Sequence, residues 1–178
     1  FKTLLFVVGM LKAGELLSCD VTLKNDRDLP VYTILVPLYH EEKTLPKLVK
    51  AIRGLNYPRA KLDVKLIVEK DDKKTIEAIK NLKCERLFEM IIVPESSPQT
   101  KPKACNYALQ FSRGQYVTIY DAEDVPESLQ LKKVLGVFEK SGEELVCVQA
   151  KLNYFNRREN LLTRLFSLEY SSLFDFLL

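Results

Sequence analysis

The sequence predicts an α/β fold, a doubly wound and mostly parallel sheet flanked by helices. Short runs of β-branched and aromatic residues alternate with longer segments whose apolar residues recur at helical spacing. Proline, glycine and charged residues separate these segments. Because parallel strands are joined by crossover connections that usually contain a helix, this alternation is typical of a sheet with helices on both faces.

The first strand is predicted over Tyr32–Leu38, where β-branched and aromatic residues dominate. Thr44 is then expected to cap a helix that Asn56-Tyr57-Pro58 ends. The apolar residues of this helix follow helical spacing at Leu45, Leu48, Val49, Ile52 and Leu55. A second strand over Val64–Val68 leads into an acidic turn and another helix.

The rest of the chain continues the same alternation. The later elements are, in order, a helix through Ile76, Ile79 and Leu82, a strand over Phe88–Val93, a helix from Pro102 to Ser112, a strand after Gly114, a helix from Ser128 to Lys140 and a strand over Leu145–Gln149. We expect Gly114 to close the Pro102 helix, since glycine is common just past helix ends. The chain therefore carries five predicted strands separated by helices.

Length and composition fit one globular domain with a sizeable core, since the 178 residues are 47% hydrophobic and 29% charged. A net charge of +3 is too small to indicate a nucleic-acid partner. The four cysteines are scattered without close pairs, which indicates reduced thiols rather than a cysteine-rich zinc site. A single histidine, His40, excludes a site built from several histidines.

The two ends differ from the middle. Residues 1–28 open with an apolar run that is much shorter than the roughly 20 residues needed to span a bilayer, so they form a core helix, an interfacial segment or the tail of a membrane helix. Residues 157–178 carry more apolar residues than one helical face holds, so this helix is buried or meets a missing part of the protein. Residues 29–156 between them are expected to form a ligand-binding domain.

The strand after Gly114 ends at three acids, Asp121, Glu123 and Asp124. One interpretation is a helix cap, because Asp124 can accept backbone N–H bonds while Pro126 and Glu127 suit a first helical turn. Capping leaves Asp121 and Glu123 unexplained, and two unpaired carboxylates that close repel each other. A hard cation with oxygen ligands removes this repulsion, so we expect a metal site here.

Polar clusters also follow the other predicted strands. These clusters are Tyr39-His40-Glu41-Glu42, Glu69-Lys70-Asp71-Asp72 and Thr100-Lys101-Pro102-Lys103. Parallel strands bring such clusters to one crevice, where acids suit a base, a ribose or a metal and lysines suit a diphosphate. Since no glycine-rich phosphate loop is present, metal and lysine must hold any phosphates. These residues indicate a metal-assisted transferase with a diphosphate leaving group.

The motif set also resembles a known family. LPVYTILVPLYHEE (29–42), TKPKACNYAL (100–109), YDAEDVPE (120–127) and QAKLNYFN (149–156) are similar to bacterial cellulose-synthase-like family 2 glycosyltransferases. The likeness covers nearly the whole chain from Leu29 onward. It implies the GT-A fold, a nucleotide-diphosphate sugar as donor (we expect a UDP-sugar), Mg²⁺ or Mn²⁺ as cofactor, and inversion at the anomeric carbon.

The resemblance also implies roles for individual residues. The implied substrate-binding residues are Tyr39, Glu41, Glu69, Asp71, Lys101, Asn106 and Asp121. Tyr39 and Glu41 would line the nucleotide pocket, and Glu69 or Asp71 would contact the base or ribose. Lys101 matches the lysine near the diphosphate and Asn106 the asparagine that follows it. Asp121 and Glu123 match the two acids of the metal motif, with glutamate in place of the commoner aspartate.

The chain departs from the family pattern toward its carboxyl end. It contains no Thr-Glu-Asp motif, the motif that supplies the general base in this family. It also contains no Gln-x-x-Arg-Trp motif and no tryptophan at any position. We therefore expect the donor-binding part of a transferase that is inactive alone, with the general base outside this chain. The parent enzyme would act on a glycan or lipid acceptor at the cytoplasmic face of the bacterial inner membrane. The alternative is a non-catalytic nucleotide- or cation-binding module.

Overall fold

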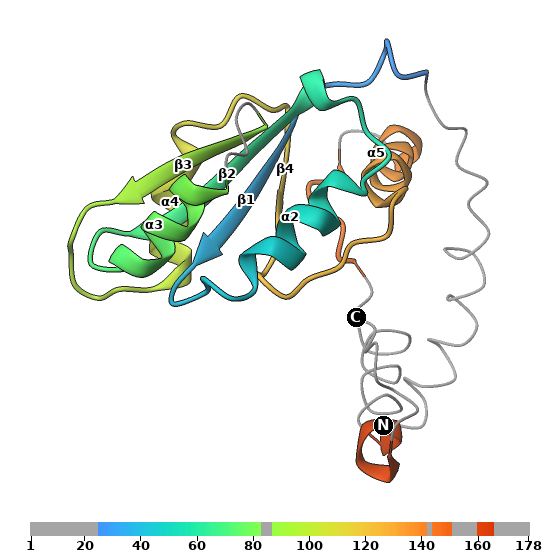
Figure 1. The fold of residues 1–178 in the computed structure, drawn as a ribbon. Helices are drawn as coiled ribbons and strands as arrows, with labels where there is room; N and C mark the ends of the chain where they lie inside the picture. The colour runs from blue at the N-terminus through green and yellow to red at the C-terminus, as the bar shows by residue number, and fades with distance from the viewer. Residues whose placement is uncertain (1–24, 83–86, 142–143, 151–159, 166–178) are drawn as a thin grey trace. The chain divides into compact units, whose positions relative to one another are not determined.

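The computed structural model describes residues 25–82, 87–141, 144–150 and 160–165. Its elements, in chain order, are β1 (Tyr32–Leu38), α2 (Leu45–Arg53), the 3₁₀-helix η1 (Arg59–Lys61), β2 (Leu62–Glu69), α3 (Lys73–Asn81), β3 (Phe88–Val93), α4 (Lys101–Leu109), β4 (Tyr116–Ile119) and α5 (Gln130–Ser141). The four strands form one sheet in the order β3-β2-β1-β4, and every pair is parallel (Figure 1). The predicted α/β fold is confirmed.

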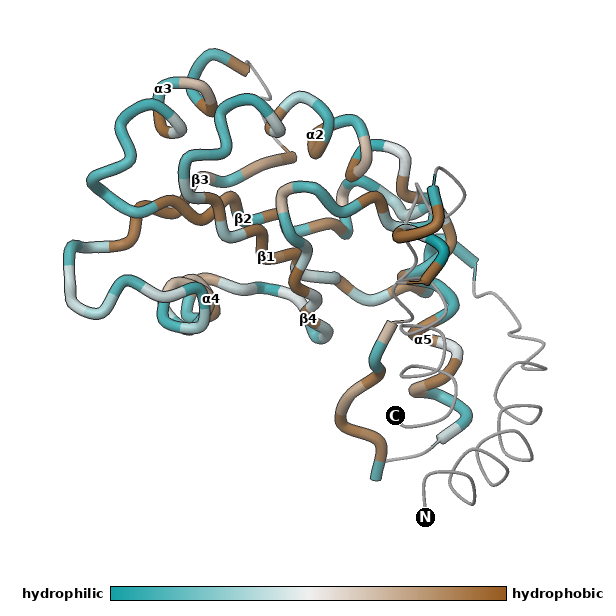
Figure 2. The backbone as a smooth tube through the Cα atoms, turned by 90° about the horizontal axis from the view of Figure 1, so that it is seen from below, coloured by the Kyte–Doolittle hydropathy of each residue, from teal (hydrophilic) through white to brown (hydrophobic). Residues whose placement is uncertain are grey.

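Strands β1 and β2 form the centre of the sheet and are buried over almost their whole length. Such continuous burial is typical of parallel strands that helices cover on both faces. Figure 2 shows α2 and α3 on one side of the sheet and α4 on the other. The sheet therefore has the doubly wound arrangement that the sequence predicts.

Alternate residues of the strands face the two helical layers. Leu35, Ile67, Ile91 and Val93 form a buried cluster with three small residues of α4, which are Ala104, Cys105 and Ala108. Small side chains allow the α4 backbone to approach the sheet closely, which places the amino end of α4 beside the ends of β1 and β2. Helix α2 buries the apolar face that its sequence predicts, and Thr44 precedes the helix without a side-chain capping bond.

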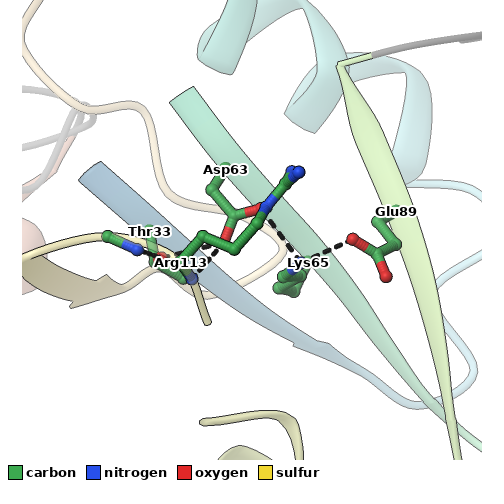
Figure 3. A network of polar contacts seen from close by, with 6 residues as sticks. Thr33, Asp63, Lys65, Glu89 and Arg113 are labelled. Atoms are coloured by element: carbon green, nitrogen blue, oxygen red, sulfur yellow. Dashed lines mark hydrogen bonds and ion pairs between the residues drawn. The ribbon is translucent and has the colours of Figure 1, made fainter. Parts of the chain in front are cut away.

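A polar network with a buried centre, formed by Thr33, Asp63 and Lys65, joins the beginnings of the strands (Figure 3). Asp63 of β2 accepts hydrogen bonds from Thr33 Oγ1 of β1 at 2.9 Å and from the Arg113 guanidinium at 2.7 and 3.0 Å. Lys65, which is 1% exposed, lies between Asp63 at 2.9 Å and Glu89 at 2.5 Å. Burial alone would raise the pKa of Asp63, but a hydrogen bond from the Arg113 backbone N–H at 3.0 Å, together with those of Lys65, the Arg113 guanidinium and Thr33, lowers it to about 2. The network lies at the amino ends of the strands and fixes three of them to one another.

Two predictions about the elements were wrong. Leu145–Gln149 is not a strand, and Val146 is 89% exposed. A strand requires a second backbone to bond with, and in the described part of the chain the ladders join only β1, β2, β3 and β4. Gly114 does not close α4, which ends at Leu109 with Gln110 as its C-cap. A Cβ on Gly114 would lie 2.4 Å from the Thr33 backbone nitrogen, so the glycine permits a close approach of backbone to β1.

The chain divides into two compact units, Leu23–Lys133 and a second made of Phe1–Thr22 with Val134–Leu178. The sheet and helices α2, α3 and α4 belong to the first unit. Most of the predicted end segments, 1–28 and 157–178, lie outside the described residues. Within the described ranges, no helix has both the length and the apolar character needed to cross a membrane.

Candidate functional site

A cavity of about 390 Å³ lies at the carboxyl ends of the strands. Its walls are formed by Pro37, Leu38, Tyr39, Glu41, Ile67, Glu69, Gln99, Thr100, Lys101, Ala104, Asp121, Ala122 and Glu123. Segments that are far apart in the sequence meet here, namely the ends of β1 and β2, the start of α4 and the turn after β4. All of these residues belong to one compact unit.

The strand order explains why the cavity forms at this place. The chain moves outward from β1 to β2 and β3, and then returns across the sheet so that β4 pairs with the other edge of β1. The loops that leave β1 and β4 therefore diverge. A crevice at such a switch point, outside the carboxyl ends of parallel strands, is the usual ligand site of an open α/β sheet.

Lys101 and Asp121 contact each other across the cavity. The Lys101 ammonium forms an ion pair with Asp121 Oδ1, and both side chains are about half exposed. Lys101 is also the first residue of α4, so its charge adds to the positive end of the helix dipole. The sequence interpretation treated Asp121 as unpaired, which was wrong, because Lys101 already supplies a positive charge. This end of the cavity combines groups that suit a diphosphate with a carboxylate that suits a cation.

Glu69 brings a buried carboxylate to the cavity. The residue is 6% exposed, and its Oε2 has no hydrogen-bond partner among the described residues. Its Oε1 lies 3.9 Å from the Lys103 ammonium, which also donates to the Ser96 carbonyl oxygen at 2.9 Å. Because buried polar atoms are nearly always hydrogen-bonded, Oε2 is suited to accept a bond from an N–H or O–H group of a ligand.

Of the three other predicted nucleoside contacts, Tyr39 and Glu41 follow β1 and line the cavity, and Asp71 follows β2. Tyr39 is 49% exposed, and its ring centroid lies 4.1 Å from that of His40. The nearby Asp71 carboxylate is the main cause that raises the pKa of Tyr39. Asp71 is therefore close to the Tyr39 phenol, although it does not line the cavity itself.

Asn106, like Asp71, is a predicted site residue that does not line the cavity. It is exposed on α4, while Lys101 and Ala104 of the same helix line the cavity. Residues two apart on a helix point about 200° apart, so Asn106 faces away when Ala104 faces inward. Gln99 shows the reverse case, since it lines the cavity and was not singled out from the sequence. Its only sequence signal is its position directly before the Thr100-Lys101 cluster.

The capping interpretation of Asp124 was wrong in its details. Helix α5 begins at Gln130, six positions later, so Asp124 is not its N-cap. Instead, Asp124 Oδ2 accepts a hydrogen bond from the Asp121 backbone N–H at 2.8 Å, and the Asp124 N–H donates to the Asp121 carbonyl at 3.1 Å. Asp124 thus closes a tight turn that holds Asp121 and Glu123 at the cavity wall. The sequence pattern correctly indicates that the Asp124 carboxylate accepts a backbone N–H, but this N–H belongs to Asp121 and not to the first turn of a helix.

The donor set fits a divalent cation only in part. Asp121 and Glu123 are hard oxygen donors on one cavity wall. However, no group of three His, Cys, Asp or Glu side chains within the described ranges could hold a metal ion. Mg²⁺ is commonly held by one or two carboxylates together with substrate phosphates. The residues therefore fit a cation whose coordination a bound diphosphate completes.

Curated relatives agree on a chemical class. The chain is 27% identical over 149 residues to “Probable glycosyltransferase YdaM” of Bacillus subtilis, a match that covers 82% of this chain and 35% of that protein. It is 29% identical over 139 residues to a β-monoglucosyldiacylglycerol synthase of Nostoc, which covers 76% of this chain and 29% of that protein. The chain thus spans about a third of the length of these relatives.

Solved structures share the fold. A mannosyltransferase of Pyrobaculum calidifontis, in complex with GDP-Man and Mn²⁺, matches 76% of this chain and 40% of its own with a TM-score of 0.58 and 23% identity. Residues 1–349 of Staphylococcus aureus TarS, in complex with UDP-GlcNAc, match 61% of this chain and 31% of their own with a TM-score of 0.52 and 19% identity. These likenesses show the fold, which is the GT-A type that the sequence resemblance implies.

The family assignment rests on the sequence itself. The model of the family described as “Glycosyl transferase family 2” matches residues 33–177, which include the sheet except Tyr32, the first residue of β1, and every residue of the cavity wall. The chain therefore belongs to glycosyl transferase family 2.

Proposed function

We propose that this chain is the donor-binding region of an inverting, metal-dependent glycosyltransferase that takes a sugar from a nucleotide-diphosphate sugar, with UDP as the expected nucleotide. The observation that carries the proposal is the cavity at the strand ends. It brings Lys101, Asp121 and Glu123 together with Tyr39, Glu41 and Glu69 from four separate segments of the chain.

Each group has a role that suits its chemistry. Lys101 and the amino end of α4 would bind the diphosphate and stabilise the charge that develops on it as the sugar departs. Tyr39, Glu41, Glu69 and Asp71 would bind the nucleoside, with the free Glu69 Oε2 as an acceptor for a donor group of the base or ribose. Asp121 and Glu123 would hold Mg²⁺ or Mn²⁺. When bound, the cation supplies Lewis-acid stabilisation of the leaving diphosphate.

The proposed reaction is attack of an acceptor hydroxyl oxygen on the anomeric carbon. The new bond forms on the face opposite the departing nucleoside diphosphate, which inverts the anomeric centre. The general base that removes the hydroxyl proton would come from a part of the enzyme outside this chain. Within this chain, the residues bind and orient the donor.

Names of relatives support the finer parts of the proposal. One structural neighbour binds GDP-Man with Mn²⁺ and another binds UDP-GlcNAc. The Nostoc relative is named for the synthesis of a glucolipid. We therefore propose a glycan or lipid acceptor. On the motif resemblance alone, we also propose a parent enzyme of the cellulose-synthase-like type at the cytoplasmic face of the bacterial inner membrane.

Calorimetric titration of the chain with UDP and with GDP tests the proposal. We expect UDP to bind in Mn²⁺ and to bind at least about tenfold more weakly in EDTA, because the phosphates and carboxylates share the cation. Lys101→Met should weaken binding in both conditions. Lys80→Met is the matched control, since Lys80 lies exposed in the last turn of α3 and does not line the cavity.

Two outcomes would change the proposal. Equal UDP affinity in Mn²⁺ and EDTA would contradict the metal assignment. A full-length parent enzyme that binds UDP with Mn²⁺ but transfers no sugar from any donor would support the alternative, a nucleotide- or cation-binding module without catalysis.

A further inference from the structure

The loop that carries Tyr39 and Glu41 into the cavity is held from outside the cavity. Two of its backbone N–H groups donate to side chains of α3 and its N-cap, none of which lines the cavity. The His40 N–H donates to Asp72 Oδ2 at 2.7 Å, and the Glu41 N–H donates to Thr75 Oγ1 at 3.2 Å. His40 itself adopts a left-handed backbone with φ of 57°, which non-glycine residues rarely adopt without support.

Asp72 and Thr75 are well suited to hold this loop. The Asp72 side chain is 1% exposed and Thr75 is 0% exposed. Asp72 Oδ1 also accepts from the Thr75 N–H at 3.2 Å as the N-cap of α3, so the two residues are fixed to each other. Because buried side chains in a capped helix have little freedom, the bonds to His40 and Glu41 fix the loop against a rigid support.

We propose that Asp72 and Thr75 are positioning residues for the donor site, which set the place of Tyr39 and Glu41 without touching the nucleotide. The inference rests on the proposed function, because it takes the cavity to be a nucleotide site. Preorganisation is the physical reason, since a loop that is already in its bound shape loses less conformational entropy when the ligand binds.

Isosteric substitution at Thr75 isolates the effect. Thr75→Val removes the hydroxyl acceptor while it keeps the buried shape, and Thr75→Ser keeps the hydroxyl. We expect Thr75→Val to weaken UDP binding in Mn²⁺ about five- to tenfold, the effect of about one lost hydrogen bond on the bound state. Thr75→Ser should bind within about twofold of wild type, so that the conservative variant rescues the function.

The chain offers a matched control in Thr33. Thr33 is also a 0% exposed threonine whose Oγ1 accepts a backbone N–H, that of Gly114 at 2.9 Å, but it lies at the opposite end of β1. Thr33→Val and Thr75→Val should both lower the melting temperature. Only Thr75→Val should weaken nucleotide binding. Equal weakening by both variants, or wild-type affinity in Thr75→Val, overturns the inference.

The Asp72 carboxylate accepts two backbone hydrogen bonds, from His40 and from Thr75, and Asp72→Asn should remove only the one from His40. The asparagine oxygen can still cap α3, while its amide group cannot accept the His40 N–H. We expect the amides of His40 and Glu41 to exchange with solvent deuterium about tenfold faster in Asp72→Asn and Thr75→Val than in wild type, without any nucleotide present. Unchanged exchange in both variants contradicts the holding role.

The binding measurements also keep the inference distinct from the proposed function on which it rests. If the wild-type chain binds neither UDP nor GDP, the proposed function fails, and the role in a donor site fails with it. If the wild type binds UDP and Thr75→Val binds it equally well, the function stands and the positioning role alone is wrong.

Discussion

Asp121 and Asp124 stand three residues apart in one turn, and their carboxylates have different partners. Asp121 contacts the Lys101 ammonium at the cavity, whereas Asp124 accepts the Asp121 backbone N–H. The Asp121 side chain therefore lines the cavity, while the Asp124 side chain fixes the shape of the turn. Two residues of the same type thus differ in their surroundings because the fold supplies each with a different partner.

Alanine substitutions should separate these two roles. Asp124→Ala should lower the free energy of unfolding by roughly 0.5–1.5 kcal/mol, the usual value of one hydrogen bond, and keep a metal-dependent effect of UDP. Asp121→Ala should abolish the increase in melting temperature that Mn²⁺ and UDP produce together. Thermal melts of both variants, with and without Mn²⁺ and UDP, provide the measurement. A metal-dependent shift that survives in Asp121→Ala but not in Asp124→Ala would assign the ligand role to Asp124.

Strands β1 and β4 meet closely because Gly114 has no side chain. A Cβ there would lie 2.4 Å from the Thr33 backbone nitrogen and 2.8 Å from Thr33 Oγ1. Since a backbone atom cannot move aside as a flexible side chain can, we expect Gly114→Ala to lower the free energy of unfolding by about 2–4 kcal/mol. Urea unfolding at neutral pH provides the measurement.

A second glycine is the control for this element-scale prediction. Gly54 has φ of −78° at the end of α2, and its nearest contact for a Cβ is the Ala51 carbonyl oxygen at 3.2 Å. Gly54→Ala should change stability by no more than about 1 kcal/mol, because alanine can adopt this conformation. A similar loss in both variants would show that the close approach at Gly114 is not the cause.

The free energy of unfolding should depend on pH because Asp63 is ionised in the polar network at the starts of the strands. The pKa of Asp63 is lowered from 3.8 to about 2, so its ionised form stabilises the folded state. This contribution is fully present above about pH 4 to 5 and is lost as the pH falls toward 2. It amounts to about 2 kcal/mol.

Asp63→Asn tests this expectation. The variant should lose about 2 kcal/mol of unfolding free energy at pH 7 and approach the wild type as the pH falls through 2, where Asp63 becomes protonated in the folded state. Urea titrations at several pH values between 2 and 7 measure the unfolding free energy of the variant and of the wild type. The contributions of the other acidic residues cancel in the difference between the two. A difference that stays constant over this range would show that the ionised carboxylate is not what stabilises the network.

At the scale of the whole molecule, the chain spans about a third of its curated relatives. We expect it to bind the donor and to hydrolyse it slowly at most, without sugar transfer, because its sequence carries no Thr-Glu-Asp motif for a general base. Assays with radiolabelled UDP-sugars and glycan or lipid acceptors check this. Efficient transfer by the 178-residue chain would show that the base lies among these residues.

The sequence by itself determined the local elements and most of the cavity wall. Apolar periodicity predicted the four observed strands and the helices between them, because side-chain spacing decides which face of an element is buried. The polar clusters after the strands contain Tyr39, Glu41, Glu69, Lys101, Asp121 and Glu123, which the family resemblance singles out, and all six line one cavity in the structure.

Only the tertiary structure decided which segments meet. Strand order, the absence of a strand at Leu145–Gln149, the position of Asn106 outside the cavity and the support of the Tyr39 loop by Asp72 and Thr75 all depend on residues far apart in sequence. A local sequence pattern indicates that a segment can pair with another strand or that a carboxylate can accept a backbone N–H. The partner that accepts each hydrogen bond is set by the packing of the whole sheet, because such bonds join segments that only the fold brings together.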